Sequence, residues 1–216
     1  MTPLRLRYQT LEFGIHDLHV RSLRDRSQFS DDDGAAEQLG ICSAAWPFFG
    51  IVWASGQILA EHMAGFDIGG KRILEVGCGI ALASLVLNQR QANITTTDYH
   101  PEVESFLKEN VKLNNGARIP FVRTGWGDAI SELGEFDLVI GSDLLYERDH
   151  VDLLSRFINQ HTKPQCEVIL VDPGRGNHAR FSKKMVSLGY AHTQAPPVNA
   201  DIVSPAFRGQ ILSYTR

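Results

Sequence analysis

The sequence predicts an α/β protein built on a doubly wound sheet of mostly parallel strands. From about Lys71 onward, short apolar runs alternate with stretches of helical spacing. Two of these runs, FDLVIGS at 136–142 and EVILVD at 167–172, are nearly continuous in apolar or β-branched residues. Continuous runs are typical of parallel strands that helices cover on both faces, and the alternation is typical of α/β architecture.

The N-terminal part of the chain predicts a β-rich extension over residues 1–49, ahead of a domain over 50–216. LRLRYQTLEF at 4–13 alternates by twos, and IHDLHVRSLRD at 15–25 has similar spacing. The polar stretch SQFSDDDG at 27–34 is expected to be a loop. These patterns indicate folded structure before the main sheet.

The main domain is expected to begin with a helix and then to alternate strands with helices. Helical spacing of apolar residues marks the first helix, in GIVWASGQILAEHM. The next elements are expected as strands at 72–76, 93–99 and 120–124 and helices at 81–90 and 102–115. Pro101 and Gly116 flank the second of these helices, as start and stop residues do.

The last part of the chain predicts an antiparallel end to the sheet. After Asp172, a helix at about 177–188 is followed by candidate strands near 190–194 and 208–214. The irregular APPVNADIVSPAF stretch joins these strands. We therefore expect a closing hairpin.

Composition disfavours several classes of function. Lys and Arg number 21 and Asp and Glu number 25, giving a net charge of −4 without the basic excess that nucleic-acid binding needs. No apolar run approaches ~20 residues, and the start lacks the features of a signal peptide. We expect a soluble, cytoplasmic protein with neither nucleic acid nor membrane as a partner.

The cysteines and histidines do not form a metal-binding pattern. The three cysteines are widely spaced, and the eight histidines show no H-x-x-x-H or His/Cys grouping. No G-x-S-x-G sequence or evident Cys/His pair supports acyl transfer. We predict no metal site and no disulfide scaffold.

A glycine turn follows the predicted strand at 72–76. Its residues, Glu75-Val76-Gly77-Cys78-Gly79, precede a helix whose first N–H groups are free for a ligand. This arrangement indicates a nucleotide-type site. Tight strand-to-helix turns also use glycine for steric reasons alone.

Asp98 lies 21 residues after Gly77, at the end of the next predicted strand. A carboxylate there accepts both hydroxyls of a ribose, although Asp98 could instead cap the following helix. A nicotinamide cofactor requires Gly or Ala where Leu82 stands. Glu75 adds negative charge, which suits the ammonium and sulfonium of S-adenosylmethionine better than phosphates.

Further segments extend this pattern into a family resemblance. Besides ILEVGCG and TTTDY, they are VWASGQILAEHM before the first strand of the main domain, TGWGD after its third and GSDLLYERDH at the end of its fourth. From about Gly50 to Arg216 the chain resembles the seven-β-strand class I methyltransferases. The resemblance is closer to the branch of protein-lysine methyltransferases and nicotinamide-methylase-like proteins. It implies a Rossmann-like seven-stranded sheet and S-adenosylmethionine as the cofactor.

The resemblance also implies which residues bind the cofactor. They are Trp53, Gly77, Cys78, Gly79, Asp98, Trp126 and Asp128. We add Glu75 for its charge, and Ser142, whose backbone could touch the adenosyl group. Ala54 stands where the family has proline, so Trp46-Pro47 is a rival for Trp53, and both pocket tryptophans could be core residues. Asp128 is expected either to receive the adenine amino group or to cap a short helix after it.

Asp143-Leu144-Leu145-Tyr146 matches the D-x-x-Y sequence of the family, and the resemblance makes Asp143 and Tyr146 the catalytic residues. Their spacing places both on one face if the segment forms a helical turn. Asp143 would orient a substrate amine and Tyr146 would hold it or narrow the pocket. Alternatively, Asp143 caps the helix that begins near Asp149, and Tyr146 is a half-buried aromatic.

The segment VDPGRGNHARF resembles the DPGR of electron-transfer-flavoprotein lysine methyltransferases. The resemblance places Asp172 and Arg175 at the substrate entrance, although a plain turn also explains Pro-Gly.

We therefore expect an S-adenosylmethionine-dependent N-methyltransferase that acts on a lysine of another protein. A small-molecule amine is the alternative acceptor, because a fold does not fix the substrate. The same residues are also compatible with a noncatalytic adenosyl-ligand-binding module or with a nicotinamide-dependent oxidoreductase.

Overall fold

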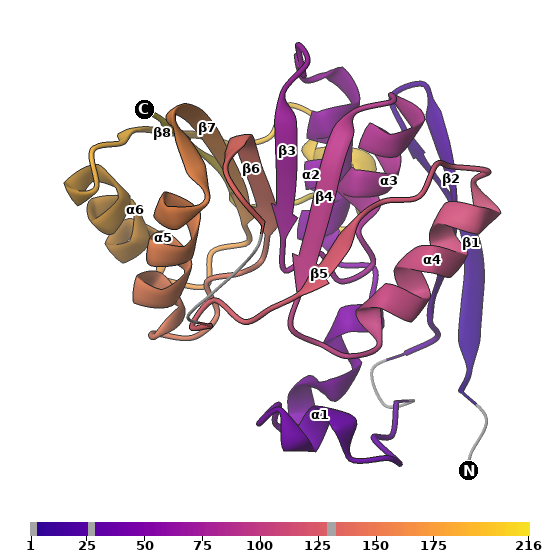
Figure 1. The fold of residues 1–216 in the computed structure, drawn as a ribbon. Helices are drawn as coiled ribbons and strands as arrows, with labels where there is room; N and C mark the ends of the chain where they lie inside the picture. The colour runs from indigo at the N-terminus through magenta and orange to yellow at the C-terminus, as the bar shows by residue number, and fades with distance from the viewer. Residues whose placement is uncertain (1–3, 26–28, 129–132) are drawn as a thin grey trace.

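A computed structural model describes residues 4–25, 29–128 and 133–216. Its centre is a seven-stranded sheet in the order β5-β4-β3-β6-β7-β9-β8, with helices on both faces (Figure 1). The strands are β3 (Arg72–Val76), β4 (Asn93–Asp98), β5 (Phe121–Arg123), β6 (Phe136–Ser142), β7 (Thr162–Asp172), β8 (Ala191–Ala195) and β9 (Gln210–Thr215). The main helices are α2 (Ala54–Gly65), α3 (Leu82–Gln89), α4 (Val103–Leu113), α5 (His150–Gln160) and α6 (His178–Ser187).

Strand pairing confirms the predicted doubly wound, mostly parallel sheet. β3 pairs in parallel with β4 and β6, β4 with β5, and β6 with β7. β9 pairs antiparallel with both β7 and β8, which confirms the closing hairpin. The switch in strand order between β3 and β6 leaves a crevice at the carboxyl ends of these strands, where α/β sheets bind ligands.

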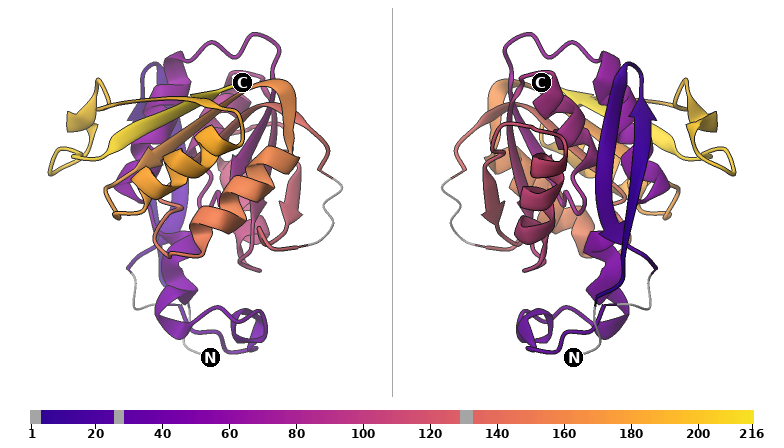
Figure 2. Two further views of the ribbon diagram at one scale, coloured as in Figure 1. Left: turned by 90° about the vertical axis from the view of Figure 1, so that its left-hand side faces the viewer. Right: turned by 90° about the vertical axis from the view of Figure 1, so that its right-hand side faces the viewer.

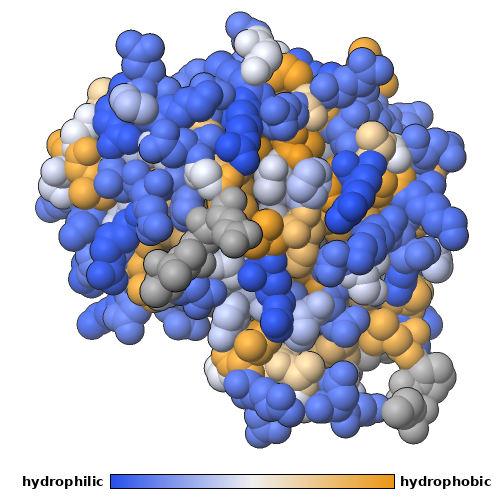
Figure 3. All heavy atoms as spheres, in the orientation of Figure 1, coloured by the Kyte–Doolittle hydropathy of each residue, from blue (hydrophilic) through white to orange (hydrophobic). Residues whose placement is uncertain are grey.

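The two faces of the sheet bury separate hydrophobic cores. Successive residues of a strand point to opposite faces, so Ile73 packs with α2, α3 and α4, whereas Leu74 packs with α5 and α6. The outer surface in Figure 3 is mostly hydrophilic, as expected when the apolar side chains are gathered in two cores. This two-sided burial explains the nearly continuous apolar runs in the sequence.

The N-terminal extension is β-rich, as predicted. β1 (Leu6–Phe13) and β2 (His16–Leu23) form an antiparallel hairpin that lies along α4 (Figure 2). Leu18 and Val20 of β2 are buried in the same core as α3 and α4. The hairpin and the main sheet therefore share one core.

Two asparagines, Asn110 of α4 and Asn114 at its C-cap, attach the free edge of the hairpin. The Asn110 side chain accepts the Arg21 N–H at 2.7 Å and donates to the Arg21 carbonyl at 3.1 Å. Asn114 makes the same pair of bonds to His19, both at 2.8 Å. These amides replace a neighbouring strand and satisfy backbone groups that an edge strand leaves exposed.

The segment between the hairpin and the main domain contains a short helix, α1 (Ala35–Gln38), and a 3-10 helix, η1 (Ser43–Gly50). A second 3-10 helix, η2 (Ala200–Ile202), lies between β8 and β9. None of the helices in the described part of the chain has the length and apolar character needed to cross a membrane.

Candidate active site

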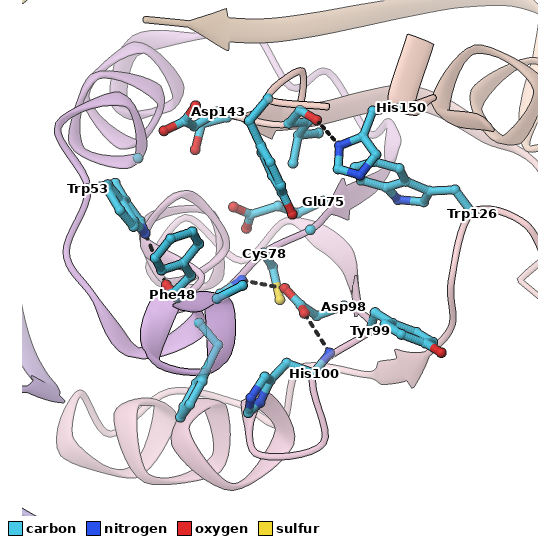
Figure 4. A pocket seen from close by; sticks show the side chains of 18 of the residues that line it. Phe48, Trp53, Glu75, Cys78, Asp98, Tyr99, His100, Trp126, Asp143 and His150 are labelled. Atoms are coloured by element: carbon cyan, nitrogen blue, oxygen red, sulfur yellow. Dashed lines mark hydrogen bonds between the residues drawn. The ribbon is translucent and has the colours of Figure 1, made fainter. Parts of the chain in front are cut away.

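A pocket of about 830 Å³ opens at the carboxyl ends of the parallel strands (Figure 4). The structure brings together at its wall every residue predicted for cofactor binding or catalysis: Trp53, Glu75, Gly77, Cys78, Gly79, Asp98, Trp126, Asp128, Ser142, Asp143 and Tyr146. Arg175 also lines this pocket, whereas Asp172 is not part of the lining. The residues meet because the loops that follow parallel strands lie at the same edge of the sheet.

The glycine turn between β3 and α3 has a backbone that favours glycine. Gly77 and Gly79 have φ angles of 59° and 50°, in the left-handed region. A Cβ at Gly77 would lie 2.6 Å from Leu144 Cδ2, and one at Gly79 would lie 3.1 Å from the Phe49 carbonyl oxygen. The steric reason for these glycines is therefore real, and the turn also forms part of the pocket wall.

Asp98 connects the glycine turn to the loop after β4. Its Oδ2 accepts the Gly79 N–H at 2.9 Å and its Oδ1 accepts the His100 N–H at 2.9 Å. Burial raises the pKa of Asp98. The N-cap residue of α4 is Glu102, so the alternative in which Asp98 caps this helix is not what the structure shows.

Glu75 is the buried acid beneath the glycine turn. It accepts hydrogen bonds from the backbone N–H of Ser84 at 3.0 Å and from the Ser84 hydroxyl. Burial raises the pKa of Glu75 to about 7, so the negative charge expected from the sequence is incomplete at neutral pH. Burial also raises the pKa of the neighbouring Cys78 thiol, which leaves it a poor nucleophile.

The two predicted tryptophans lie on opposite sides of the pocket (Figure 4). Trp53 precedes α2 and its indole N–H donates to the Phe48 carbonyl at 3.0 Å. Trp126 packs edge-on against His150, with ring centroids 5.0 Å apart. The rival tryptophan, Trp46, bonds to a nearby carbonyl and is not among the residues that line the pocket.

Asp128 closes the loop that carries Trp126. Its Oδ2 accepts the Gly125 N–H at 2.6 Å and the Thr124 hydroxyl at 3.1 Å. Whether Asp128 caps a short helix after it is a prediction that concerns residues 129–132, which lie outside the described residues.

The helical turn that would place Asp143 and Tyr146 on one face does not form. The segment is irregular, and α5 begins only at His150. The Asp143 N–H donates to the Val171 carbonyl at 2.9 Å, extending the β6–β7 pairing, and its φ of 55° then turns the chain. Both side chains reach the pocket from this irregular loop, so their approach depends on the turn at Asp143 and not on helical spacing.

The Asp143 carboxylate is bound by Arg175. The Nε and Nη2 atoms of Arg175 donate to Oδ1 and Oδ2 of Asp143, each at 2.8 Å. This contact raises the pKa of Arg175. Asp143 therefore does not cap α5, and Arg175 lies at the pocket rim as expected. Asp172 accepts the Gly174 N–H at 2.8 Å and so stabilises the turn that carries Arg175.

Tyr146 lies on the rim with its ring against His150, at a centroid distance of 4.5 Å. His150 is oriented by a 2.8 Å contact between its Nδ1 and the Leu144 carbonyl. Burial and nearby carboxylates raise the pKa of Tyr146 to about 12. The phenol therefore keeps its proton at neutral pH and is a hydrogen-bond donor.

Sequence reasoning missed several pocket residues. His150 lines the wall, as do the stacked rings of Phe49 and His100, with centroids 4.1 Å apart, and the half-exposed Phe48 and Tyr99. Burial lowers the pKa of His100 to about 4, so this ring is neutral at physiological pH. Tyr99 belongs to the TTTDY segment, but nothing local distinguishes it from a core aromatic. Phe48 and Phe49 come from η1, which precedes the residue at which the main domain was expected to begin.

No group of three or more His, Cys, Asp or Glu side chains arranged to hold a metal ion occurs within 4–25, 29–128 and 133–216.

Comparison with solved structures finds the same fold in methyltransferases. A methyltransferase from Pyrococcus furiosus superimposes with a TM-score of 0.61 and 18% identity, covering 87% of this chain and 98% of that one. At this identity the likeness concerns the fold alone.

The profile of the lysine methyltransferase family matches residues 45–187, which is more than half of the chain. The chain belongs to this family. It is 28% identical over 142 residues to protein N-lysine methyltransferase METTL21A of Xenopus tropicalis, covering 62% of this chain and 61% of that protein. It is 26% identical over 144 residues to the electron transfer flavoprotein beta subunit lysine methyltransferase of Xenopus laevis, covering 65% and 56%. The chain thus spans about three fifths of the length of these relatives.

Proposed function

We propose that this protein is an S-adenosylmethionine-dependent N-methyltransferase whose acceptor is a lysine side chain of another protein. The observation that carries this proposal is the distribution of acids in one pocket. Glu75 and Asp98 lie on the sheet side and Asp143 lies apart from them in the same pocket. Tyr146 also lines the pocket and is exposed to solvent. Glu75 and Asp98 suit a cofactor that carries positive charge and a ribose. Asp143 and Tyr146 suit the amine of an acceptor.

The residues of the inner pocket fit this cofactor. Glu75 is a buried acid that no cation of the described chain contacts by a salt bridge, and a cationic ligand would stabilise its ionised form. Asp98 keeps free lone pairs beyond its two backbone bonds and is placed to accept ribose hydroxyls. Trp126 and Tyr99 offer aromatic surfaces for a planar base. When bound, the cofactor supplies an electrophilic methyl group on a sulfonium.

The rim residues position the acceptor. Methyl transfer is an in-line displacement, so the protein mainly aligns the nucleophile and excludes water. Asp143 accepts a hydrogen bond from the acceptor amine, and the Tyr146 hydroxyl borders the amine's path. A lysine with a pKa of ~10.4 must first lose its proton, at a free-energy cost of about 4.6 kcal/mol at pH 7. Water carries this proton away, because Asp143 stabilises the charged amine and so opposes its loss.

The organisation and location of the protein are part of this proposal. We assign the transfer chemistry to residues 50–216 and treat residues 1–49 as an extension that completes one core. The three cysteines are unpaired, which fits a reducing compartment such as the cytoplasm.

The test is methyl transfer from tritium-labelled S-adenosylmethionine, with a protein extract and a small-molecule extract as separate acceptors. We expect label on lysine in a polypeptide, identified by mass spectrometry, and none with Asp143→Ala. Label only in the small-molecule fraction would establish the alternative acceptor. Calorimetry should show binding of S-adenosylhomocysteine and not of NAD. Binding without any transfer would indicate an adenosyl-ligand-binding module.

A further inference from the structure

The loop after β7 places an arginine against the acid expected to hold the acceptor. Arg175 approaches Asp143 with both edge nitrogens of its guanidinium at 2.8 Å. The Asp143 side chain is 12% exposed and that of Arg175 is 44% exposed, so the pair lies between the pocket and solvent. Such a bidentate contact fixes orientation as well as charge.

The loop is built to hold this arginine. Asp172 accepts the Gly174 N–H before Arg175, and the Asn177 side chain donates to the Leu145 carbonyl at 2.9 Å after it. The second bond connects the loop directly to the segment that carries Asp143. Arg175 is therefore held from both sides at the end of β7.

Arg175 changes the charge of the acceptor site. Among the described pocket-lining residues, it is the one side chain with a permanent positive charge. Asp172 and Tyr146 act on Arg175 beside Asp143. Tyr146 in turn is close enough to feel Cys42, Asp98 and Glu147. His150 and His178 contact Glu147 and Asp172, and Glu75 lines the same pocket. Most of the charged groups in this set are acids, so without Arg175 the rim would attract and retain an ammonium ion.

The geometry leaves Asp143 able to contact an amine as well. A carboxylate has about four lone-pair positions, and the guanidinium uses one on each oxygen. An acceptor amine therefore gains a hydrogen-bond acceptor of fixed orientation whose charge is largely cancelled. A cancelled charge stabilises the protonated amine less than a free carboxylate does.

We propose that Arg175 is a positioning residue that fixes Asp143 and cancels its charge, so that the bound acceptor lysine loses its proton more readily. This inference rests on the proposed function. It predicts that removing the positive charge strengthens acceptor binding but slows transfer at neutral pH, because the amine is then retained as an ammonium.

The experiment compares wild type, Arg175→Gln, Arg175→Lys and the control Arg180→Gln. Arg180 is an exposed arginine of α6 whose contact is with Asp152, at 3.5 Å. The acceptor is the polypeptide that the wild-type enzyme labels, purified, and kcat and KM are measured between about pH 6 and about pH 10. For Arg175→Gln we expect KM to fall about threefold and kcat at pH 7 to fall about tenfold. The apparent pKa of the acidic limb of the profile of kcat against pH should rise by about one unit.

Arg175→Lys keeps the positive charge but not the bidentate geometry of the guanidinium. The acidic limb of its kcat profile should therefore match that of wild type even if its kcat is lower. A superimposable profile for Arg175→Gln, a raised KM, or a faster kcat at pH 7 would overturn the inference. A faster kcat would instead mean that Arg175 blocks the site.

A second measurement needs no protein acceptor. Binding of n-butylamine, which carries the amine of lysine, is followed at pH 7 with S-adenosylhomocysteine present. Arg175→Gln should bind it several-fold more tightly than wild type, and equal affinity would contradict the inference. If the wild type labels no polypeptide, the proposed function fails, whereas this measurement still reports on Arg175.

Discussion

The Asp98 carboxylate accepts the Gly79 backbone N–H at 2.9 Å, which ties the end of β4 to the glycine turn after β3. The same carboxylate accepts the His100 N–H. The residue expected to bind the cofactor therefore also fixes the two loops that form the pocket. Loss of the Asp98 side chain should therefore remove its contact with the cofactor and also change the geometry of both loops.

Replacing Asp98 with Ala should abolish detectable binding of S-adenosylhomocysteine, and Asp98→Asn should weaken it at least about tenfold, because a hydrogen bond to a charged group contributes about 1.5–3 kcal/mol. Calorimetry at pH 7.5 measures this loss. Asp201→Ala, which removes an exposed carboxylate in η2, should bind as wild type does. Wild-type affinity for both Asp98 variants would show that the ribose is held elsewhere.

Asp143→Ala should retain cofactor binding but lose methyl transfer by at least about a hundredfold, because the acceptor is no longer oriented. Tyr146→Phe should have a smaller effect, since it removes a hydroxyl and keeps the ring that packs on His150. Binding is measured by calorimetry and transfer by tritium incorporation. Full activity of Asp143→Ala would remove this residue from the mechanism.

Glu75 should make cofactor binding release protons. Its pKa of about 7 in the free protein means that about half of the molecules carry a proton there at pH 7. A cationic cofactor favours the carboxylate and expels that proton, so affinity should fall as pH drops below 7. Calorimetry in two buffers of different ionisation enthalpy should give release of about half a proton at pH 7. Glu75→Gln should abolish this proton release. An unchanged proton release in this variant would mean that another group loses the proton.

Glu75 should also affect the stability of the free protein. Its pKa is raised from the reference value of 4.5 to about 7 by burial, so folding favours the protonated form. The contribution of this proton is fully present below about pH 4.5 and is lost as pH rises through about 7. Relative to wild type, Glu75→Gln should therefore gain stability between these values, by up to about 3 kcal/mol. Urea unfolding at both ends of the window measures the difference, and a pH-independent difference would argue against the raised pKa.

Gly77→Ala should destabilise the protein by about 2–4 kcal/mol. Alanine is strained at the φ of 59°, and its Cβ would lie 2.6 Å from Leu144. Gly176→Ala is the matched control, because its φ is 88° and no atom lies within 4 Å of the added Cβ. The control should therefore cost only the backbone strain, about 1–2 kcal/mol. Equal losses for the two variants in urea unfolding would mean that Leu144 moves aside without cost.

The glycine turn and Asp98 were accessible from the sequence because they are local features of strand ends. A strand followed by Gly-x-Gly and a helix defines its own backbone, and the next parallel strand brings its last residue to the same edge. The sequence did not predict, from local features of this kind, that the Asp143 side chain points into the pocket. Its spacing to Tyr146 suggested a helical turn, but a hydrogen bond to Val171 and a positive φ decide the conformation instead.

The aromatic wall formed by Phe48, Phe49 and His100 shows a similar limit. Phe49 and His100 stack although they are far apart in the chain. Their pairing depends on how η1 lies over the loop after β4. No periodicity in either segment encodes that packing.

The sequence by itself determined the parallel sheet, the alternation of its strands and helices along the chain and the pocket edge, because residue periodicity and turn chemistry act over a few neighbouring residues. Only the tertiary structure decided that Arg175 binds Asp143, 32 residues away, and that Asn110 of α4 and its C-cap Asn114 hold the N-terminal hairpin. These contacts depend on the positions of irregular loops and helix faces in space. Such positions are fixed by the packing of the whole molecule and not by any one segment.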